Sequence, residues 1–444
     1  MINSWLASLF FFLYIVIAVV IGFTASRRET EEGFMLAERK VGSIFLAASM
    51  SAGFFDGFAL AAYLAYIYQF GLSALWMFIG VGVGFLWLRR FAPRIKARAD
   101  ALRVYSMPEF FFRVFGKRSG LAFSFILVVQ FFLLLIVNLI VSGKVLSAIF
   151  PLPYGVAAAI GGAIILSYLL LGGFKAVVRT DFFQLCIMVL MSLSVALYLF
   201  GRTTIPVSEL NLGAMGWSTT LGFLIIGTFN MMVAPDLWQR IFASRDERAL
   251  RNALTMGAVI LIVLAAVISV AGIATKLAFP DIAPEDALVT SFKNLLPFGL
   301  REFGLVLLYA VALSSSDTVT FVVSSILTRD LQNYTRRFSE ESMRKLTRIF
   351  MVFFVLLALS IGLLYQNIIA LAFTLTGLTL ALFPAVFGSF YWKLSDRAVF
   401  WSIVVAVGSL LVPIYFNALT PETVVVTLPV ALLSLVVGQY VSHH

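Results

Sequence analysis

The sequence predicts an all-α polytopic membrane protein with about 13 transmembrane helices, and three observations support this fold class. Of the 444 residues, 61% are hydrophobic and only 12% are charged, and the mean hydropathy is +1.01. Apolar runs of about 20 residues, the length that crosses a bilayer as a helix, recur along the whole chain. The third observation is the distribution of lysine and arginine between these runs.

The predicted transmembrane helices follow one another with short connections. Each run has the length and apolar composition that a membrane-spanning helix needs. They are predicted at residues 5–24, 43–66, 71–91, 120–146, 153–171, 181–201, 214–234, 251–275, 303–327, 346–366, 368–391, 397–416 and 421–441. The residues between 276 and 302 form the longest predicted outer loop, and its three prolines indicate a short, partly helical cap.

The basic residues gather on one side of the predicted membrane. All but five of the 32 lysines and arginines fall in the loops that follow every second span, beginning with the first; the exceptions are Lys144, Arg202, Lys276, Lys293 and Arg301. Cytoplasmic loops are enriched in Lys and Arg, so we expect a plasma-membrane protein with its N-terminus outside and its C-terminus in the cytoplasm. The net charge of +10 then faces membrane lipid, and no nucleic-acid partner is expected.

The sequence lacks the residues that several functional classes require. The only histidines are His443 and His444, which argues against a Ser-His-Asp triad. The single cysteine, Cys186, excludes a disulfide framework and a thiolate metal site. No GxxxxGK[ST] loop is present to bind a nucleotide. We therefore expect that the chain is not an enzyme. We also expect it to function as a monomer.

Four ionisable residues lie within predicted spans, where charge is costly and usually functional: Asp56, Lys144, Asp181 and Asp317. Lys144 lies near the outer end of its helix and is expected to extend to the surface. Ser314, Asp317 and Thr318 have i, i+3, i+4 spacing and share one helical face. This face predicts a cation or proton site, although serine and threonine also mediate close helix packing.

Two predicted spans contain interruptions that would expose backbone carbonyls at mid-membrane. Gly53 and Gly57 flank Asp56 in one span, and residues 214–234 contain Gly216, Gly222, Gly227 and Asn230. Interrupted helices in corresponding positions are typical of inverted-repeat transporters. The spacing predicts repeats over 43–201 and 214–391. Residues 1–42 and 392–444 then form peripheral segments of one membrane domain that covers 1–444.

Four stretches resemble motifs of the sodium:solute symporter family. EEGFMLAERKVG (31–42) resembles its FxLAGRxLG loop, with Glu38 in place of the usual glycine, and GGFKAVVRTDFFQ (172–184) is similar to GGxxAVxxTDxxQ. LWQRIFASRDERALRNA (237–253) resembles the WQRxxAAxxxxxA loop, and residues 311–331 resemble the family's serine-rich helix. All four occur in the family's order.

The resemblance implies a leucine-transporter-like 5+5 inverted-repeat core with flanking helices, and Na⁺-driven uptake of a small-molecule solute by alternating access. It implies a main Na⁺ site formed by the carbonyls of Phe54, Gly57 and Val311 and the hydroxyls of Ser314 and Ser315.

Some family members bind a second cation at the positions of Asp181, Asp317 and Thr318. Asp317 replaces a hydroxyl there, so it could strengthen a cation site, bind a proton, or pair with a base such as Arg179.

The resemblance also favours an amino-acid-like, proline-like solute, because Asp56 matches an aspartate of the proline branch. The residues after Asp56 are small or apolar, unlike those that a sugar would need. Asp56, Gly57, Gly227 and Asn230 are the predicted substrate contacts. Two alternatives stay open. One is a proton-coupled symporter on the same scaffold, with Asp317 or Asp56 as the carrier, and the other is a transporter-like membrane sensor.

Overall fold

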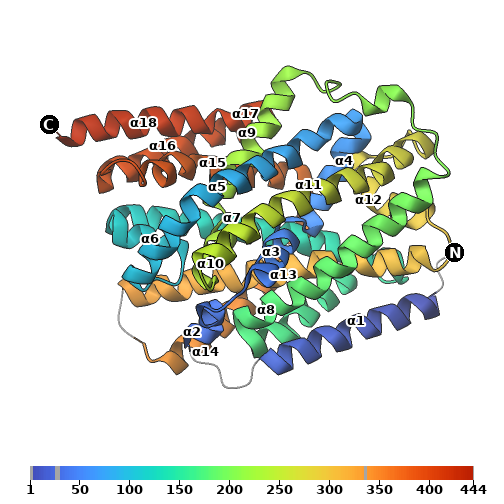
Figure 1. The fold of residues 1–444 in the computed structure, drawn as a ribbon, viewed down its shortest axis with the longest axis horizontal. Coiled ribbons are helices and arrows are strands. Elements are labelled where there is room, and N and C mark those ends of the chain that lie inside the picture. Colours follow the sequence, from blue (N-terminus) through green and yellow to red (C-terminus); the bar gives the residue numbers. More distant parts are fainter. Residues whose placement is uncertain (1–3, 26–30, 335–337, 444) are drawn as a thin grey trace.

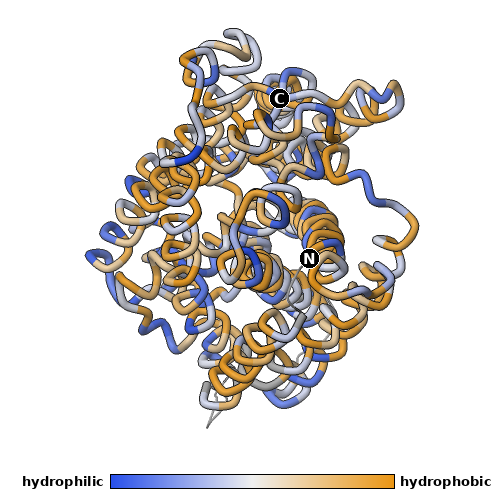
Figure 2. The backbone as a smooth tube through the Cα atoms, turned by 90° about the vertical axis from the view of Figure 1, so that its right-hand side faces the viewer, coloured by the Kyte–Doolittle hydropathy of each residue, from blue (hydrophilic) through white to orange (hydrophobic). Residues whose placement is uncertain are grey.

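The computed structural model describes residues 4–25, 31–334 and 338–443, and nearly all of them lie in helices. Within these ranges the β-structure is limited to an isolated parallel bridge between Val41 and Ser244. The long helices run roughly along one direction, and the two termini lie at opposite ends of the molecule (Figure 1). Hydrophobic residues predominate along the chain (Figure 2). These features confirm the predicted all-α membrane class.

The helices differ widely in length. They are α1 (Ser4–Ala25), α2 (Glu31–Leu36), α3 (Ser43–Phe54), α4 (Gly57–Phe70), α5 (Trp76–Leu102), α6 (Met107–Val114), α7 (Lys117–Ile149), α8 (Tyr154–Phe200), α9 (Trp217–Val233), α10 (Pro235–Ala243), α11 (Glu247–Ala278), α12 (Ala287–Asn294), α13 (Leu300–Tyr334), α14 (Glu340–Leu364), α15 (Ile368–Gly388), α16 (Asp396–Tyr415), α17 (Pro421–Val425) and α18 (Thr427–His443).

Within the described ranges, nine helical segments are long and apolar enough to cross a membrane, and a tenth is obtained if α9 and α10 count as one bent span. Three shorter apolar helices, Trp5–Ile21, Ser43–Phe54 and Tyr154–Ser167, add to these. Each of the 13 predicted spans overlaps these segments, and the span predicted at 43–66 extends over two of them, α3 and the α4 part of Ala59–Leu102.

Helix α8 contains two predicted spans although its helical assignment is continuous. Along α8, the residues of α13 that it contacts lie first progressively closer to the C-terminal end of α13 and then closer to its N-terminal end again. They pair Gly161 with Tyr309, Phe174 with Phe321 and Met191 with Gly304. The chain therefore runs along α13 in one direction and back in the other, as two spans would.

Two spans are broken in the middle of the bundle. Helix α3 ends at Phe54 and α4 begins at Gly57, and the Asp56 carboxylate caps α4 by accepting a hydrogen bond from the Ala59 amide at 2.5 Å. Helices α9 and α10 meet at Ala234 with a bend of 46°. Each break lies in the first span of a predicted repeat; the repeat boundaries themselves stay a prediction.

The glycine pattern placed the second break wrongly, because α9 is continuous through Gly222, Gly227 and Asn230. The break lies at Ala234 because Pro235 has no N–H for α9 and disfavours a helical conformation in the residue before it. Pro235 then suits the first turn of α10. Gly227 instead permits close packing, since a Cβ there would lie 2.5 Å from the Met77 carbonyl oxygen of α5.

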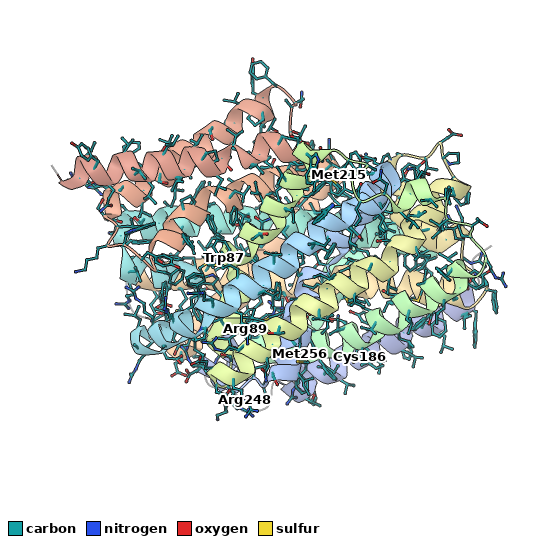
Figure 3. The ribbon with its side chains drawn as sticks, turned by 45° about the horizontal axis from the view of Figure 1, so that its top comes forward. Trp87, Arg89, Cys186, Met215, Arg248 and Met256 are labelled. Carbon is teal, nitrogen blue, oxygen red and sulfur yellow. The ribbon has the colours of Figure 1, made fainter. Side chains whose placement is uncertain are left out.

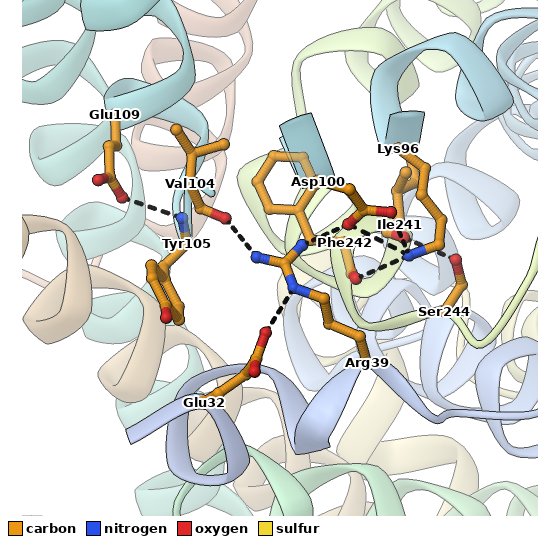
Figure 4. A network of polar contacts seen from close by, with 10 residues as sticks. All are labelled: Glu32, Arg39, Lys96, Asp100, Val104, Tyr105, Glu109, Ile241, Phe242 and Ser244. Carbon is orange, nitrogen blue, oxygen red and sulfur yellow. Dashed lines mark hydrogen bonds and ion pairs between the residues drawn. The ribbon is translucent and has the colours of Figure 1, made fainter. Parts of the chain in front are cut away.

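The basic loops meet at one end of the bundle. Arg89 of α5 and Arg248 of α11 lie toward this end, and Met215 lies toward the other (Figure 3). Arg39 forms ion pairs with Glu32 at 2.8 Å and with Asp100 at 2.7 Å (Figure 4). These contacts fasten the segment before α3 to the end of α5.

Candidate functional site

A cavity with two lobes lies beside both helix breaks. The polar lobe, about 110 Å³, is lined by side chains that include Asp56, Gln130, Asn230, Asp236, Thr376 and Thr379. The aromatic lobe, about 80 Å³, is lined by side chains that include Phe54, Tyr66, Met77, Phe223, Ile226 and Phe373. Both lobes share Phe54, Ala59, Asn230 and Thr376, so they adjoin at the break between α3 and α4.

The predicted main Na⁺ ligands lie where α3 and α4 meet α13. A Cβ on Gly57 would lie 2.7 Å from the Ala312 Cβ, so the start of α4 lies directly against α13 next to Val311. Ser315 is 1% exposed, and its hydroxyl has no hydrogen-bond partner in the described part of the chain. The side chain of Ser314 lies outside the described residues. A hard cation that prefers oxygen ligands fits the buried Ser315 hydroxyl and the carbonyls at the end of α3.

Asp56 is held in place from two sides. Its Oδ1 accepts from the Ala59 amide, and its Oδ2 accepts from Asn138 Nδ2 of α7 at 3.1 Å. Asn138 thus acts as an interhelical hydrogen-bonding residue. The Asp56 residue is 3% exposed and lines the polar lobe, where a carboxylate favours a positively charged group.

Arg240 of α10 connects four helices through a fully buried guanidinium. Its Nη2 donates to Asp181 Oδ2 of α8 at 3.0 Å and to the Thr318 hydroxyl of α13 at 3.4 Å. Its Nε donates to the Ser49 hydroxyl of α3 at 2.8 Å, and its Nη1 donates to Asp236 Oδ2 at 3.2 Å. Asp181 also accepts from Ser49 at 2.5 Å. Counting Arg240 among the residues of a cytoplasmic loop was therefore wrong.

This guanidinium bears directly on the second predicted cation site. It bridges Asp181 and Thr318, two of the three predicted ligands. Asp317, the third, is fully buried on the same turn as Thr318. Among the described residues, no group of three or more histidine, cysteine, aspartate or glutamate side chains is arranged to hold a metal ion. The second site stays a prediction.

The predicted substrate contacts divide into two kinds. Asp56 and Asn230 line the polar lobe. Gly57 and Gly227 lie at close helix crossings, against α13 and α5 respectively, where a side chain would not fit. Gly227 also borders the aromatic lobe. Asn230 belongs to the last turn of α9 and not to an unwound segment, since its carbonyl accepts from the Ala234 amide at 3.0 Å.

Three polar residues of this region were not among the predicted site residues: Gln130, Asp236 and Arg240. Arg240 had been counted with a cytoplasmic loop, and Asp236 lies two residues beyond the end of the span predicted at 214–234. The i, i+4 spacing of Asp236 and Arg240 on an apolar segment was the available signal, because such a pair suits one buried helical face.

Comparisons with known proteins agree with this geometry. The sequence model described as the sodium:solute symporter family matches residues 34–204 and 203–411. The osmoregulated proline transporter OpuE of Bacillus subtilis is 25% identical over 462 residues, which cover 97% of this chain and 93% of the relative. A sodium/proline symporter of Staphylococcus aureus is 29% identical over 224 residues, which cover 49% of this chain and 41% of that relative.

Solved structures show the same fold. A Na⁺-coupled sialic acid symporter in a substrate-bound, outward-open state has a TM-score of 0.82 at 17% identity, with 98% of this chain and 97% of that chain covered. Mhp1, a nucleobase-cation-symport-1 family transporter, has a TM-score of 0.55 at 13% identity, with 92% and 94% covered. The leucine-transporter-like fold is thereby confirmed. The family match extends from residue 34 to residue 411, well over half of the sequence, and this chain belongs to the sodium:solute symporter family.

Proposed function

We propose that this chain is a sodium-coupled secondary active symporter that imports a small organic solute, favouring proline-like amino acids. The observation that carries this proposal is the Ser315 hydroxyl, which is buried without a hydrogen-bond partner in the described part of the chain. Leaving such a group unsatisfied costs about 1–3 kcal/mol. Na⁺ bound by Ser315 with the carbonyls of Phe54, Gly57 and Val311 would satisfy it.

The proposed mechanism follows from the position of this site between α3–α4 and α13. Na⁺ entering from outside joins the two elements and stabilises the outward-open state. Solute then binds in the two-lobed cavity, and both ligands shift the equilibrium toward the inward-open state through their differential affinity for the two states. The membrane potential contributes about 2.3 kcal/mol per charge per 100 mV. We place the N-terminus outside, and we expect one chain to suffice.

Two observations support the proposal that the solute is proline-like. Relatives named as proline transporters align with the chain, one of them over 97% of its length. Asp56 and Asn230 lie together on the polar lobe, and the adjoining lobe is aromatic, which suits a small solute with one polar and one apolar end.

Proton coupling on the same scaffold is the second candidate. It is favoured by Asp317, a carboxylate that is fully buried in the most enclosed helix of the bundle. Buried carboxylates within a membrane frequently transfer protons.

Uptake by purified protein in proteoliposomes tests the proposal. Radiolabelled L-proline should accumulate when an inward Na⁺ gradient is imposed, and not when K⁺ replaces Na⁺. Ser315→Ala should weaken the apparent Na⁺ affinity about tenfold or more, because one ligand worth roughly 1–3 kcal/mol is lost.

Ser360→Ala is the matched control, since the Ser360 hydroxyl lies on an exposed part of α14 and donates to the Leu356 carbonyl. Its Na⁺ dependence should equal that of the wild type. Uptake that follows a pH gradient and ignores Na⁺ would favour proton coupling, and an unchanged Na⁺ dependence in Ser315→Ala would remove Ser315 from the site.

A further inference from the structure

We infer that the cavity recognises its solute through a protonated amine with N–H donors, and that the solute's carboxylate is not required for binding. This inference rests on the proposed function and concerns the same cavity. It assigns recognition of the amine to the polar lobe, in which Gln130 and Asp236 join Asp56 and Asn230.

The polar lobe presents hydrogen-bond acceptors that the protein does not satisfy. Gln130 is 4% exposed, and its Oε1 has no hydrogen-bond partner among the described residues. The Asn230 Oδ1 is also buried and has no hydrogen-bond partner among the described residues. Amide oxygens only accept, so each requires a donor from outside the described protein groups. Both residues line the polar lobe, together with the carboxylates of Asp56 and Asp236.

In the described part of the chain, the charged side chains that line this cavity are all acidic. Among the described residues that line either lobe, none is lysine, arginine or histidine. Arg240 lies behind the wall, where a Cβ on Gly53 would be 2.8 Å from its Nη2. All three of its guanidinium nitrogens already donate to protein oxygens. A solute carboxylate would therefore lack the charged donor that usually binds it.

The local charge also favours a cation. Asp56 and Asp236 place two carboxylates on the polar lobe, and the Arg240 guanidinium behind the wall already pairs with Asp181 and Asp236. Carboxylates that face a cavity stabilise a protonated amine and repel an anion.

The aromatic lobe accommodates the rest of the solute. Phe54 borders both lobes, and Tyr66 and Phe223 pack edge to face at 4.8 Å between ring centroids in the second one. Aromatic faces attract a neighbouring cation and cover an apolar ring. The arrangement fits a small amine with a compact apolar body.

Four compounds separate these features, and thermal stabilisation of purified protein in Na⁺ buffer measures their binding. L-proline has the amine and the carboxylate, and L-prolinamide has the amine without the carboxylate. Cyclopentanecarboxylate has only the carboxylate, and N,N-dimethylproline keeps the charge but lacks N–H donors. L-prolinamide should bind within about tenfold of L-proline, and cyclopentanecarboxylate at least about 100-fold more weakly. N,N-dimethylproline should bind more weakly than L-proline.

Two variants of one residue provide an internal control. Gln130→Glu should keep or strengthen binding of L-prolinamide, because it adds an acceptor with negative charge. Gln130→Lys should abolish it and should admit cyclopentanecarboxylate. If cyclopentanecarboxylate stabilises the wild type as well as L-proline does, or if neither amine stabilises it, the inference is overturned. Binding is scored here without transport, so a failure of Na⁺-driven uptake would count against the proposed function separately.

Discussion

Asp317 is fully buried on α13, next to Thr318, whose hydroxyl accepts a hydrogen bond from Arg240. A carboxylate at this depth requires a cation or a proton beside it. The family resemblance implies a hydroxyl at this position, so the substitution of a hydroxyl for the carboxylate isolates the role of its charge.

Asp317→Ser should weaken the apparent Na⁺ affinity about tenfold and make it less dependent on pH, since a hydroxyl does not titrate in this range. Na⁺ titrations of proline uptake between pH 5.5 and pH 8 measure both effects. Asp317→Asn serves as the isosteric control for size. Unchanged Na⁺ and pH dependence in both variants would show that Asp317 has no part in coupling.

For single residues, the sequence predicted burial better than it predicted the hydrogen-bond and ion-pair partners. Asp56, Asp181 and Asp317 were recognised as costly in a membrane, and all three are at most 3% exposed. Arg240 was not recognised, because counting basic residues assigns every arginine near a span end to a loop. Gln130 carries no charge and stands in an apolar helix, so only its position on the cavity distinguishes it from a packing residue.

Among the elements, the turn before α3 has an unusual backbone. Ala37, Glu38 and Arg39 have φ of 49°, 57° and 54°, in the left-handed region that favours glycine. The family motif has glycine where this chain has Glu38. Glu38 and Lys40 pair at 2.7 Å on the surface, and this hydrogen bond from Lys40 holds the pKa of Glu38 below its usual value.

Glu38→Gly should raise the free energy of unfolding by about 1 kcal/mol, because a left-handed conformation costs a residue with a side chain roughly 1–2 kcal/mol. The lost ion pair is exposed and offsets little of this gain. Thermal unfolding in detergent measures the change. Lys40→Gln breaks the same pair without changing the backbone and should leave the midpoint nearly unaltered. A lower midpoint for Glu38→Gly would mean that the Glu38 side chain makes a larger contribution than its strain.

Helix existence was predictable because a bilayer-length apolar run has few other stable structures. The positions of the breaks within the helices were less predictable. The glycines of residues 214–234 suggested an unwound segment, but Gly227 permits the close contact with α5, and the break lies at Ala234, directly before Pro235. A glycine in a span can either permit close helix packing or allow the helix to unwind. The sequence looks the same in both cases, and only the position of the neighbouring helix distinguishes them.

For the whole molecule, the buried network around Arg240 ties the broken spans to the rest of the bundle. The guanidinium joins α10 to α3, α8 and α13, which are far apart in the sequence. No local pattern predicts such a junction, since its members come from residues 49, 181, 240 and 318. The same junction contains Asp236, which lines the polar lobe of the candidate cavity, so the cavity wall and the Asp181 region share one positive charge.

Arg240→Leu should therefore lower the free energy of unfolding by about 3–5 kcal/mol, because Asp181 and Asp236 would lose their buried cation. Arg240→Leu combined with Asp181→Asn should recover part of this loss, since one of the two carboxylates that lost their cation is then neutralised. Arg251→Leu is the control, because Arg251 pairs with Glu247 at 40% side-chain exposure and should contribute less than about 1 kcal/mol. Thermal midpoints of the three variants in the same detergent decide the matter. Equal midpoints for Arg240→Leu and Arg251→Leu would mean that the bundle does not depend on the network, whereas a graded series would identify Arg240 as the residue through which the four helices hold one another.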